Sequence, residues 1–253
     1  MGRHRVVKAT LNLLQRVVQT GGKGYCILLS GQDYPLRSKE EIRAFFHQRP
    51  GTNYIETFTL PTCVWAQGGQ NRINDYKFNL STAREDFVTI PSPLSGRFYR
   101  PAAIRSWGRA LLRGKLIVHR KLLHPRKFPP YLQPYGGEHW WALTTETVGE
   151  IFAFLEAHPD YLTYHQDTLL PEEIFFHSIV EHLYRNEPDR IAPEVTFVNW
   201  GTNNSSGPSN LRLQDPECLC ALKPGYLFAR KFDAALDSAI LNALDARTGA
   251  HAE

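Results

Sequence analysis

The sequence predicts an α/β fold, because short apolar segments of strand length alternate along it with longer amphipathic segments of helix length. Residues 25–29 are typical of a buried strand, and their unbroken apolar run favours a parallel one. Residues 146–157 place apolar side chains at the spacing of a helix face that packs on a core. The 253 residues suit one large domain or two small ones. We expect a single domain over residues 1–253, with a mixed, mostly parallel sheet flanked by helices.

Further elements are expected on either side of these two. Residues 6–18 predict a helix with one apolar face. Ser38 and Glu41 have the spacing of a capping box, which predicts a helix that begins there and ends before Pro50. The remaining expected elements are strands at 54–58 and 195–200, a long loop at 65–80, a helix that begins at Pro171, a turn-rich loop at 201–208 and a closing helix through Leu236, Ile240 and Leu244.

Positive charge is distributed unevenly along the chain. The net charge is only +4, so no general affinity for polyanions follows and no nucleic-acid partner is expected. Residues 97–127 nevertheless contain ten basic residues and no acidic one. Such a run is more often a solvated helix face and loop, but it could also contact a membrane surface or an anionic partner. A peripheral membrane contact through residues 97–127 therefore remains an open alternative.

The cysteines and the hydropathy pattern bear on the cellular compartment. The four cysteines show neither a paired disulfide framework nor the spacing of a zinc site, and Cys218 and Cys220 are too close for a comfortable disulfide. A reducing compartment is the simpler inference, so we expect a cytoplasmic protein. No apolar run approaches the roughly 20 residues that cross a bilayer, and the N-terminus lacks the apolar centre of a secretory signal.

Two adjacent glutamates follow Pro171 at the expected helix start. Proline is favoured at the first helical position, and acidic side chains suit the positive end of the helix dipole. The dipole and the free backbone N–H groups would keep Glu173 ionised at neutral pH, which suits a general base. The same pattern is also ordinary at a helix start and needs no catalytic role.

Polar and aromatic side chains follow two other apolar segments. Asp33 lies just after the strand expected at residues 25–29, and ligands of open α/β sheets bind where strands end. Trp140 and Trp141 follow a glycine turn and could form a stacking platform for a sugar ring. Adjacent tryptophans more often divide between the core and the surface.

Several catalytic motifs are absent from the sequence. It contains no G-x-S-x-G elbow, no phosphate-binding glycine loop and no compact histidine or cysteine ligand set, so we expect no bound metal. It also has no D-x-D pair, which commonly holds the divalent ion of a nucleotide sugar. Positive side chains would then have to neutralise a diphosphate. Arg230 and Lys231, between Phe228 and Phe232, are the best candidates, although such a pair is more often a surface feature.

Four segments together resemble one known family. Residues 28–36, 137–144, 171–176 and 227–233 occur in the order and at the spacing found in the core-2/I-branching family of glycosyltransferases. That family includes β-1,6-N-acetylglucosaminyltransferases and peptide O-xylosyltransferases, with many bacterial members. The resemblance extends from about residue 6 to residue 233, which is nearly the whole chain.

The resemblance implies a GT-A-like fold and the metal-independent, inverting transfer of a sugar from a UDP-sugar. Family members carry their general base in a Pro-Asp-Glu motif, which here reads Pro-Glu-Glu and assigns the role to Glu173. Lys231 matches the diphosphate-binding lysine of the family, with Arg230 beside it, and Arg212 matches its second basic contact. By local pattern, the resemblance places contacts to the acceptor sugar at Glu56, Arg72 and Trp200. Together with Trp140 and Asp33, noted above, these are the residues expected to bind the acceptor or the sugar.

The resemblance also sets expectations for partners and for the start of the chain. It implies a UDP-sugar and a carbohydrate or glycoconjugate acceptor as substrates, and no cofactor. Transfer of N-acetylglucosamine is favoured, with xylosyl transfer as the alternative; a truncated, non-catalytic carbohydrate-binding relative is the alternative of another class. Animal relatives are Golgi membrane proteins, whereas we expect a bacterial protein here. The chain is expected to lack the first strand–helix unit of the fold, because residues 1–14 resemble the helix that follows that unit.

Overall fold

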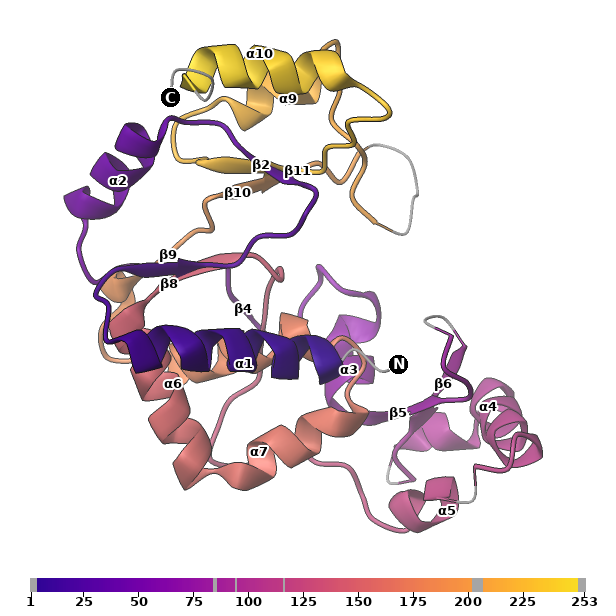
Figure 1. The fold of residues 1–253 in the computed structure, drawn as a ribbon. Coiled ribbons are helices and arrows are strands. Elements are labelled where there is room, and N and C mark those ends of the chain that lie inside the picture. Colours follow the sequence, from indigo (N-terminus) through magenta and orange to yellow (C-terminus); the bar gives the residue numbers. More distant parts are fainter. Residues whose placement is uncertain (1–3, 84–85, 94, 116, 202–206, 250–253) are drawn as a thin grey trace. The chain divides into compact units, whose positions relative to one another are not determined.

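The computed structural model describes residues 4–83, 86–93, 95–115, 117–201 and 207–249, which form two compact units (Figure 1). Each unit combines three separate stretches of the chain. The first contains Met1–Gly22, Thr57–His139 and Glu146–Asn186. The second contains Lys23–Glu56, Trp140–Thr145 and Glu187–Glu253.

The first unit is mainly helical. It holds an antiparallel hairpin of β5 (Asp75–Asn79) and β6 (Phe87–Pro91), and a short antiparallel pair of β4 (Phe58–Thr59) and β7 (Tyr135–Gly136). Its helices are α1 (His4–Thr20), α3 (Gln70–Ile73), α4 (Pro101–Leu112), α5 (Ile117–Leu122), α6 (Thr145–Ala157), α7 (Pro159–Tyr164) and α8 (Phe175–Leu183). Its 3-10 turns are η1 (Ala66–Gly69), η2 (Gly96–Tyr99), η3 (His165–Asp167) and η4 (Pro171–Glu173).

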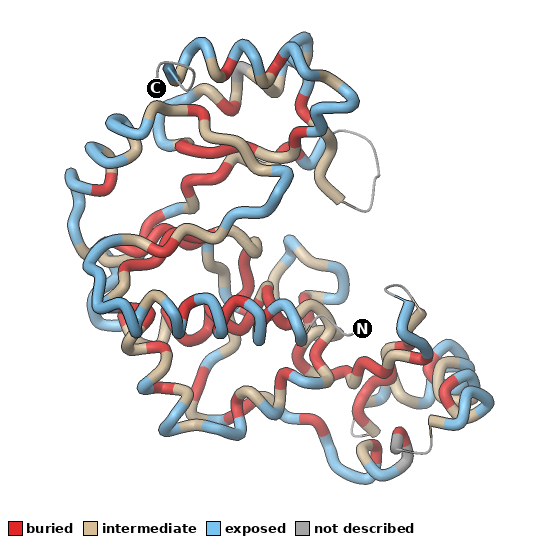
Figure 2. The backbone as a smooth tube through the Cα atoms, viewed as in Figure 1, coloured by how far each residue is buried: buried red, intermediate tan, exposed pale blue. Residues whose placement is uncertain are grey.

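Apolar burial in the first unit is concentrated in two places. The hairpin packs against α4 and α5 through a cluster that includes Phe78, Ile90 and Ala110. Helix α8 is buried along most of its length, and α1 lies against η4 with Val7 fully buried. Helix α1 alternates between buried and exposed positions, as an amphipathic surface helix does (Figure 2).

The second unit holds two mixed sheets. The larger has the strand order β1-β8-β3-β9, in which only β3 and β9 are parallel. The smaller has the order β10-β11-β2, in which β10 and β11 are parallel and β2 is antiparallel. The strands are β1 (Tyr25–Ile27), β2 (Asp33–Pro35), β3 (Asn53–Ile55), β8 (Trp141–Thr144), β9 (Ile191–Ala192), β10 (Thr196–Val198) and β11 (Phe228–Arg230). The helical elements are α2 (Lys39–Gln48), η5 (Pro188–Arg190), α9 (Pro216–Ala221) and α10 (Ser238–Thr248).

Two apolar clusters hold the second unit together. One lies between the smaller sheet and helices α9 and α10, with Ala229, Ile240 and Leu244 buried in it (Figures 1 and 2). The other joins both sheets to α2 through Phe46 and Tyr54. The short strands of this unit therefore depend on packing on their faces as well as on their few ladder hydrogen bonds.

The sequence predicted several elements correctly. Helix α2 begins after Ser38, and both hydrogen bonds of the capping box with Glu41 are present. The helices expected over residues 6–18 and 146–157 are α1 and α6. The strand expected at residues 195–200 is β10, and the closing helix is α10, although Leu236 lies outside it and is exposed. All four cysteines are free.

The prediction of a mostly parallel sheet is wrong. Among the described strands, five of the seven pairings are antiparallel, and the strand at residues 25–29 is β1, which pairs antiparallel with β8. An unbroken apolar run predicts burial on both faces, but β1 ends at Ile27 with only Cys26 buried in it, and Leu29 is 43% exposed.

Two boundary predictions are also wrong. The strand expected at residues 54–58 is divided between β3 and β4, which belong to different sheets and different units. The segment 65–80, expected to be a loop, contains η1, α3 and the whole of β5. Of the turn-rich loop expected at 201–208, residues 202–206 lie outside the described part of the chain.

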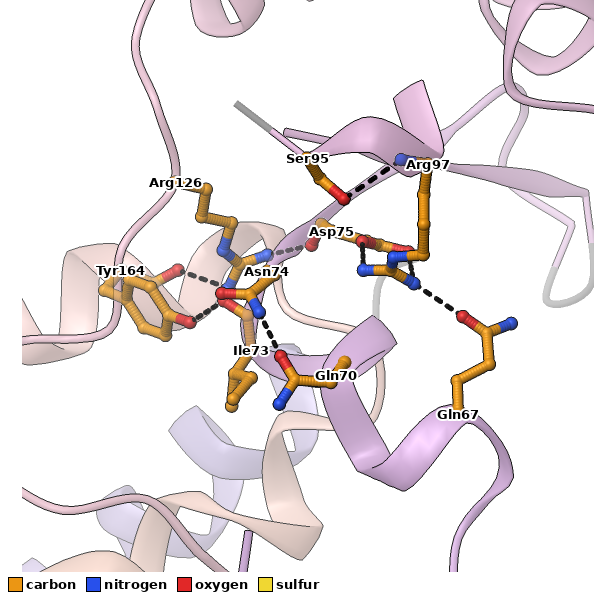
Figure 3. A network of polar contacts seen from close by, with 9 residues as sticks. All are labelled: Gln67, Gln70, Ile73, Asn74, Asp75, Ser95, Arg97, Arg126 and Tyr164. Carbon is orange, nitrogen blue, oxygen red and sulfur yellow. Dashed lines mark hydrogen bonds and ion pairs between the residues drawn. The ribbon is translucent and has the colours of Figure 1, made fainter. Parts of the chain in front are cut away.

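A buried polar network fixes the start of β5 in the first unit (Figure 3). The guanidinium of Arg126 donates hydrogen bonds to the backbone carbonyl oxygens of Asp75 and, at 2.7 Å, Asp167, and lies 4.3 Å from the ring centre of Tyr164. The Asp75 carboxylate pairs with Arg97 at 2.7 Å. Burial raises the pKa of Asp75 to about 6, and the two arginines act in the opposite direction. Part of the positive charge of residues 97–127 is thus used inside the unit.

The imidazole of His177 makes the stability of the first unit depend on pH. This side chain is fully buried on α8, and its Nε2 lies 2.7 Å from the carbonyl oxygen of Glu138. Burial is the main cause that lowers its pKa to about 3, against a partial rise from the Glu138 contact. An unfolded histidine has a pKa of about 6.5, so between these values the unfolded chain binds a proton that the folded chain does not.

We expect this histidine to stabilise the fold above pH 6.5, and that contribution to be lost as the pH falls toward 3, by at most about 1.4 kcal/mol per pH unit. Urea unfolding between pH 7 and pH 5 should therefore show a weaker pH dependence for His177→Gln than for the wild type. The exposed His47, on α2, provides the control His47→Gln, which should keep the wild-type slope. Equal slopes for His177→Gln and the wild type would refute the assignment.

Candidate functional site

Glu173 lies on the 3-10 turn η4, immediately ahead of α8. Pro171 begins this turn, but Ile174 departs from helical geometry with φ −131°, and the α-helix begins only at Phe175. The sequence placed this glutamate on the first turn of an α-helix, so the expected element is present and its boundary differs. Ile174, Phe175 and Phe176 are fully buried, which fixes the backbone of the turn.

Arg72 holds the Glu173 carboxylate. A guanidinium nitrogen of Arg72 lies 2.5 Å from Glu173 Oε2, and the two side chains are only 13% and 23% exposed. The guanidinium carbon of Arg72 also lies 3.7 Å from the ring centre of Trp65. A planar guanidinium can make this directional ion pair at its edge while its face stacks on an aromatic ring. The carboxylate therefore has a defined orientation and a partly open side.

Trp65 packs closely against Phe58 and against two glycines, Gly69 and Gly136. Its ring packs edge-on against Phe58, with ring centres 4.9 Å apart. A Cβ atom on Gly136 would lie 2.5 Å from a carbon of the Trp65 ring, and one on Gly69 would lie 2.9 Å from another. Gly69 also has φ +75°, a conformation that favours glycine. The tryptophan therefore fills a space that exists only because both positions lack a side chain.

A second group of expected site residues meets in the second unit. Asp33, the first residue of β2, is directly opposite Arg230, the last residue of β11, and Arg230 Nε lies 3.2 Å from Asp33 Oδ1. The Arg230 guanidinium carbon lies 3.8 Å from the ring centre of Trp140. Asp33 has a fully buried side chain, and burial raises the pKa of its carboxyl, opposed by the Ser30 N–H and by Arg230. Asp33 is thus a strand residue, whereas the sequence placed it in a loop after a strand.

Backbone hydrogen bonds bring Lys231, Arg212 and Trp200 to one end of the smaller sheet, where Arg230 also lies. The carbonyl oxygen of Lys231 accepts a hydrogen bond from the N–H of Leu211, and this places the next residue, Arg212, at the same end of the sheet. The carbonyl oxygen of Arg230 accepts from the N–H of Asn199, so the half-exposed Trp200 also lies at this end. Strands β10 and β11 are parallel and end here, and ligands of such sheets bind outside the carboxyl ends of the strands.

The charges at this sheet end are not equivalent. Arg230 is largely neutralised by the buried carboxylate of Asp33. Lys231 is partly buried and takes part in no ion pair with any residue that the structure describes. Arg212 is exposed, and its backbone N–H donates to the Asp215 carboxylate at 2.9 Å. Lys231 and Arg212 are therefore better suited than Arg230 to meet an incoming anion.

Glu56 and the adjacent pair Trp140 and Trp141 are the remaining residues considered for the site. Glu56 follows β3 and is exposed, and one of its carboxylate oxygens lies within 4.8 Å of one from Glu194. Trp141 is buried as the first residue of β8, whereas Trp140 is partly exposed against Arg230. The adjacent tryptophans divide between core and surface, which was the commoner of the two expectations for them.

The structure thus brings the expected residues together in two groups. Arg72 and Glu173 meet in the first unit, and Asp33, Arg230 and Trp140 meet in the second, with Lys231, Arg212 and Trp200 at the same end of the smaller sheet. Sequence reasoning missed Trp65. A tryptophan three residues before a Gly-Gly-Gln turn was a usable signal, but the polar and glycine-rich composition of the segment predicts a loop.

Comparison with known proteins decides the family. A family model described as Core-2/I-Branching enzyme matches residues 1–224. The chain belongs to this family. Glu173, Arg72, Asp33 and Arg212 lie within the match, whereas the residues after 224, with Arg230 and Lys231, follow it.

One curated relative of this Core-2/I-branching chain is the zebrafish (Danio rerio) protein named beta-1,3-galactosyl-O-glycosyl-glycoprotein beta-1,6-N-acetylglucosaminyltransferase 4. The two are 24% identical over 264 aligned residues, which cover 94% of this chain and 52% of the relative. The chain thus spans about half the length of this relative. Within the described residues, no helix has both the length and the apolar character needed to cross a bilayer.

Gly136→Ala tests how tightly the Trp65 ring packs against Gly136 and Phe58. We expect overpacking to lower the free energy of unfolding by about 1–3 kcal/mol, because the new methyl group would overlap the tryptophan and Phe58. Gly149→Ala, in α6, is the matched control: its methyl group would meet nothing within 4 Å, and alanine should stabilise the helix by up to about 1 kcal/mol. Chemical denaturation measures both. Equal stability of the Gly136 variant and the wild type would show that Trp65 does not pack tightly against Gly136.

Proposed function

We propose that this chain is an inverting, metal-independent glycosyltransferase that moves a sugar, with N-acetylglucosamine favoured, from a UDP-sugar to an acceptor hydroxyl. Family membership over residues 1–224 and the name of the zebrafish relative support a glycosyltransferase. The observation that carries the proposal is the Glu173 carboxylate, partly open and held in orientation by Arg72 on a rigidly anchored turn. Such a carboxylate can accept a proton from a bound hydroxyl.

In the proposed reaction, Glu173 removes the proton from the acceptor hydroxyl while that oxygen attacks the anomeric carbon of the donor sugar. The bond from the anomeric carbon to the UDP oxygen breaks on the opposite face, which inverts the configuration. UDP leaves with an additional negative charge. Lys231 and Arg212 stabilise this charge, with Arg230 beside them, in the role that a divalent ion fills elsewhere.

Binding of the acceptor or of the sugar is assigned to Arg72, Glu56, Trp200, Trp140 and Asp33. Arg72 orients the base and can also donate a hydrogen bond to an acceptor hydroxyl through a nitrogen that Glu173 does not use. Trp200 is half-exposed, which leaves a face for stacking on a sugar ring. The deeply buried Asp33 acts through Arg230. A screen with UDP-N-acetylglucosamine and UDP-xylose distinguishes the favoured donor from its alternative.

Glu173→Gln should lower turnover by about 10²-fold or more, the usual scale for a lost general base, and leave UDP binding nearly unchanged. The amide has the same shape but cannot take up the proton. Glu156→Gln, at an exposed position of α6, is the matched control and should keep wild-type turnover. Initial rates of sugar transfer measure the effect. Loss of turnover in Glu172→Gln with normal turnover in Glu173→Gln would move the base to the neighbouring position.

Lys231→Ala should weaken UDP binding by about tenfold or more, because a charge-assisted hydrogen bond to the diphosphate is removed. The transfer rate should fall with it. Isothermal titration calorimetry with UDP measures the affinity, and the exposed Lys223, near the end of α9, provides the control Lys223→Ala. Identical UDP affinities for Lys231→Ala and Lys223→Ala would contradict the role of Lys231.

A further inference from the structure

Helix α4 has an outward face that the fold does not use. It packs against β6, with Ala103 and Ala110 buried on that side and Trp107 packed against the apolar cluster of the hairpin. At 3.6 residues per turn, Arg105, Arg109 and Leu112 come out on the opposite side. All three are exposed, and none has a role in the site described above.

Three large apolar side chains on and beside α4 are exposed. Leu112 is 89% exposed, Ile104 51% and Tyr99, which directly precedes α4 in η2, 70%. Single exposed apolar residues are normal on protein surfaces, but here three lie on and beside one short helix. We call Tyr99, Arg100, Ile104, Arg105, Arg109 and Leu112 the α4 surface.

Positive charge accompanies these apolar side chains. Arg100, Arg105 and Arg109 are exposed, and among the described residues they take part in no ion pair. This distinguishes them from Arg97, Lys121 and Arg126, whose charges are used inside the unit. No acidic residue occurs between positions 97 and 127. The α4 surface is therefore cationic and apolar at once.

We propose that the α4 surface docks the protein on an anionic lipid bilayer. The arginines would contact lipid phosphates while Leu112, Ile104 and Tyr99 enter the headgroup region, because interfacial binding combines electrostatic attraction to anionic lipid with burial of apolar side chains. A nucleic acid matches the charge but offers no apolar layer for an exposed leucine and isoleucine, so lipid is the better match. This inference goes beyond the proposed sugar transfer and does not depend on it.

The test is sedimentation of the full chain with vesicles of phosphatidylcholine alone, or of phosphatidylcholine containing roughly one quarter phosphatidylglycerol. We expect binding to the anionic vesicles only, weakened by added salt. Arg105→Gln/Arg109→Gln should weaken it about 30-fold, which is about fivefold per arginine. Leu112→Ser should weaken it by about fivefold or more, because its apolar side chain no longer leaves water.

Matched controls carry the same chemical changes elsewhere. Lys39→Gln/Arg43→Gln removes two exposed positive charges from α2, and Leu13→Ser replaces a leucine of α1 that is also exposed. Both should bind vesicles like the wild type, and circular dichroism should show every variant folded. The proposal is wrong if neutral and anionic vesicles bind equally, or if the controls lose as much binding as the α4 variants. It is also wrong if the α4 variants impair binding to a single-stranded oligonucleotide while vesicles do not bind.

Discussion

The pairing of Arg72 with Glu173 is the interaction on which the candidate chemistry depends. A carboxylate on a turn is useful as a base only if it points in one direction, and the guanidinium fixes that direction from one side. The guanidinium is itself fixed by the Trp65 ring, which fits against Phe58 and the bare backbone of Gly136. An unbroken series of contacts thus leads from the β4–β7 pair to the candidate base.

The sequence predicted elements that depend on neighbouring residues, and it failed for features that depend on segments far apart in the chain. The Ser38 capping box and the apolar face of residues 146–157 are set by neighbours within one or two helical turns, and both were predicted correctly. The direction of β1 was predicted wrongly, because an apolar run of strand length does not define the direction of its partner strand, and β1 is only partly buried. The composition of the segment 65–80 predicts a loop and does not reveal β5, because the pairing of β5 with residues 87–91 is not visible in its own composition.

For the candidate site, the sequence predicted residue types better than the geometry that joins them. The local pattern presents Arg230 and Lys231 as one basic pair, and only the resemblance favours Lys231. The register of β11 with β2 separates them, because it places the arginine opposite a buried carboxylate and leaves the lysine at the strand end. The stacking of Trp140 on Arg230 joins two sheets of one unit, and no local pattern contains it. The helix-start pattern alone makes Glu173 a possible base, and the resemblance selects it, since Pro-Glu-Glu is common at helix starts.

The interleaving of the two units constrains how this chain can reach its folded state. The chain passes from one unit to the other five times. The shortest of these stretches, Trp140–Thr145 in the second unit, supplies β8, which lies between β1 and β3. Neither unit is therefore one uninterrupted fragment that could be synthesised or excised by itself. Ordering either unit means closing long loops before most contacts can form, which favours slow, concerted folding over stepwise assembly from the N-terminus.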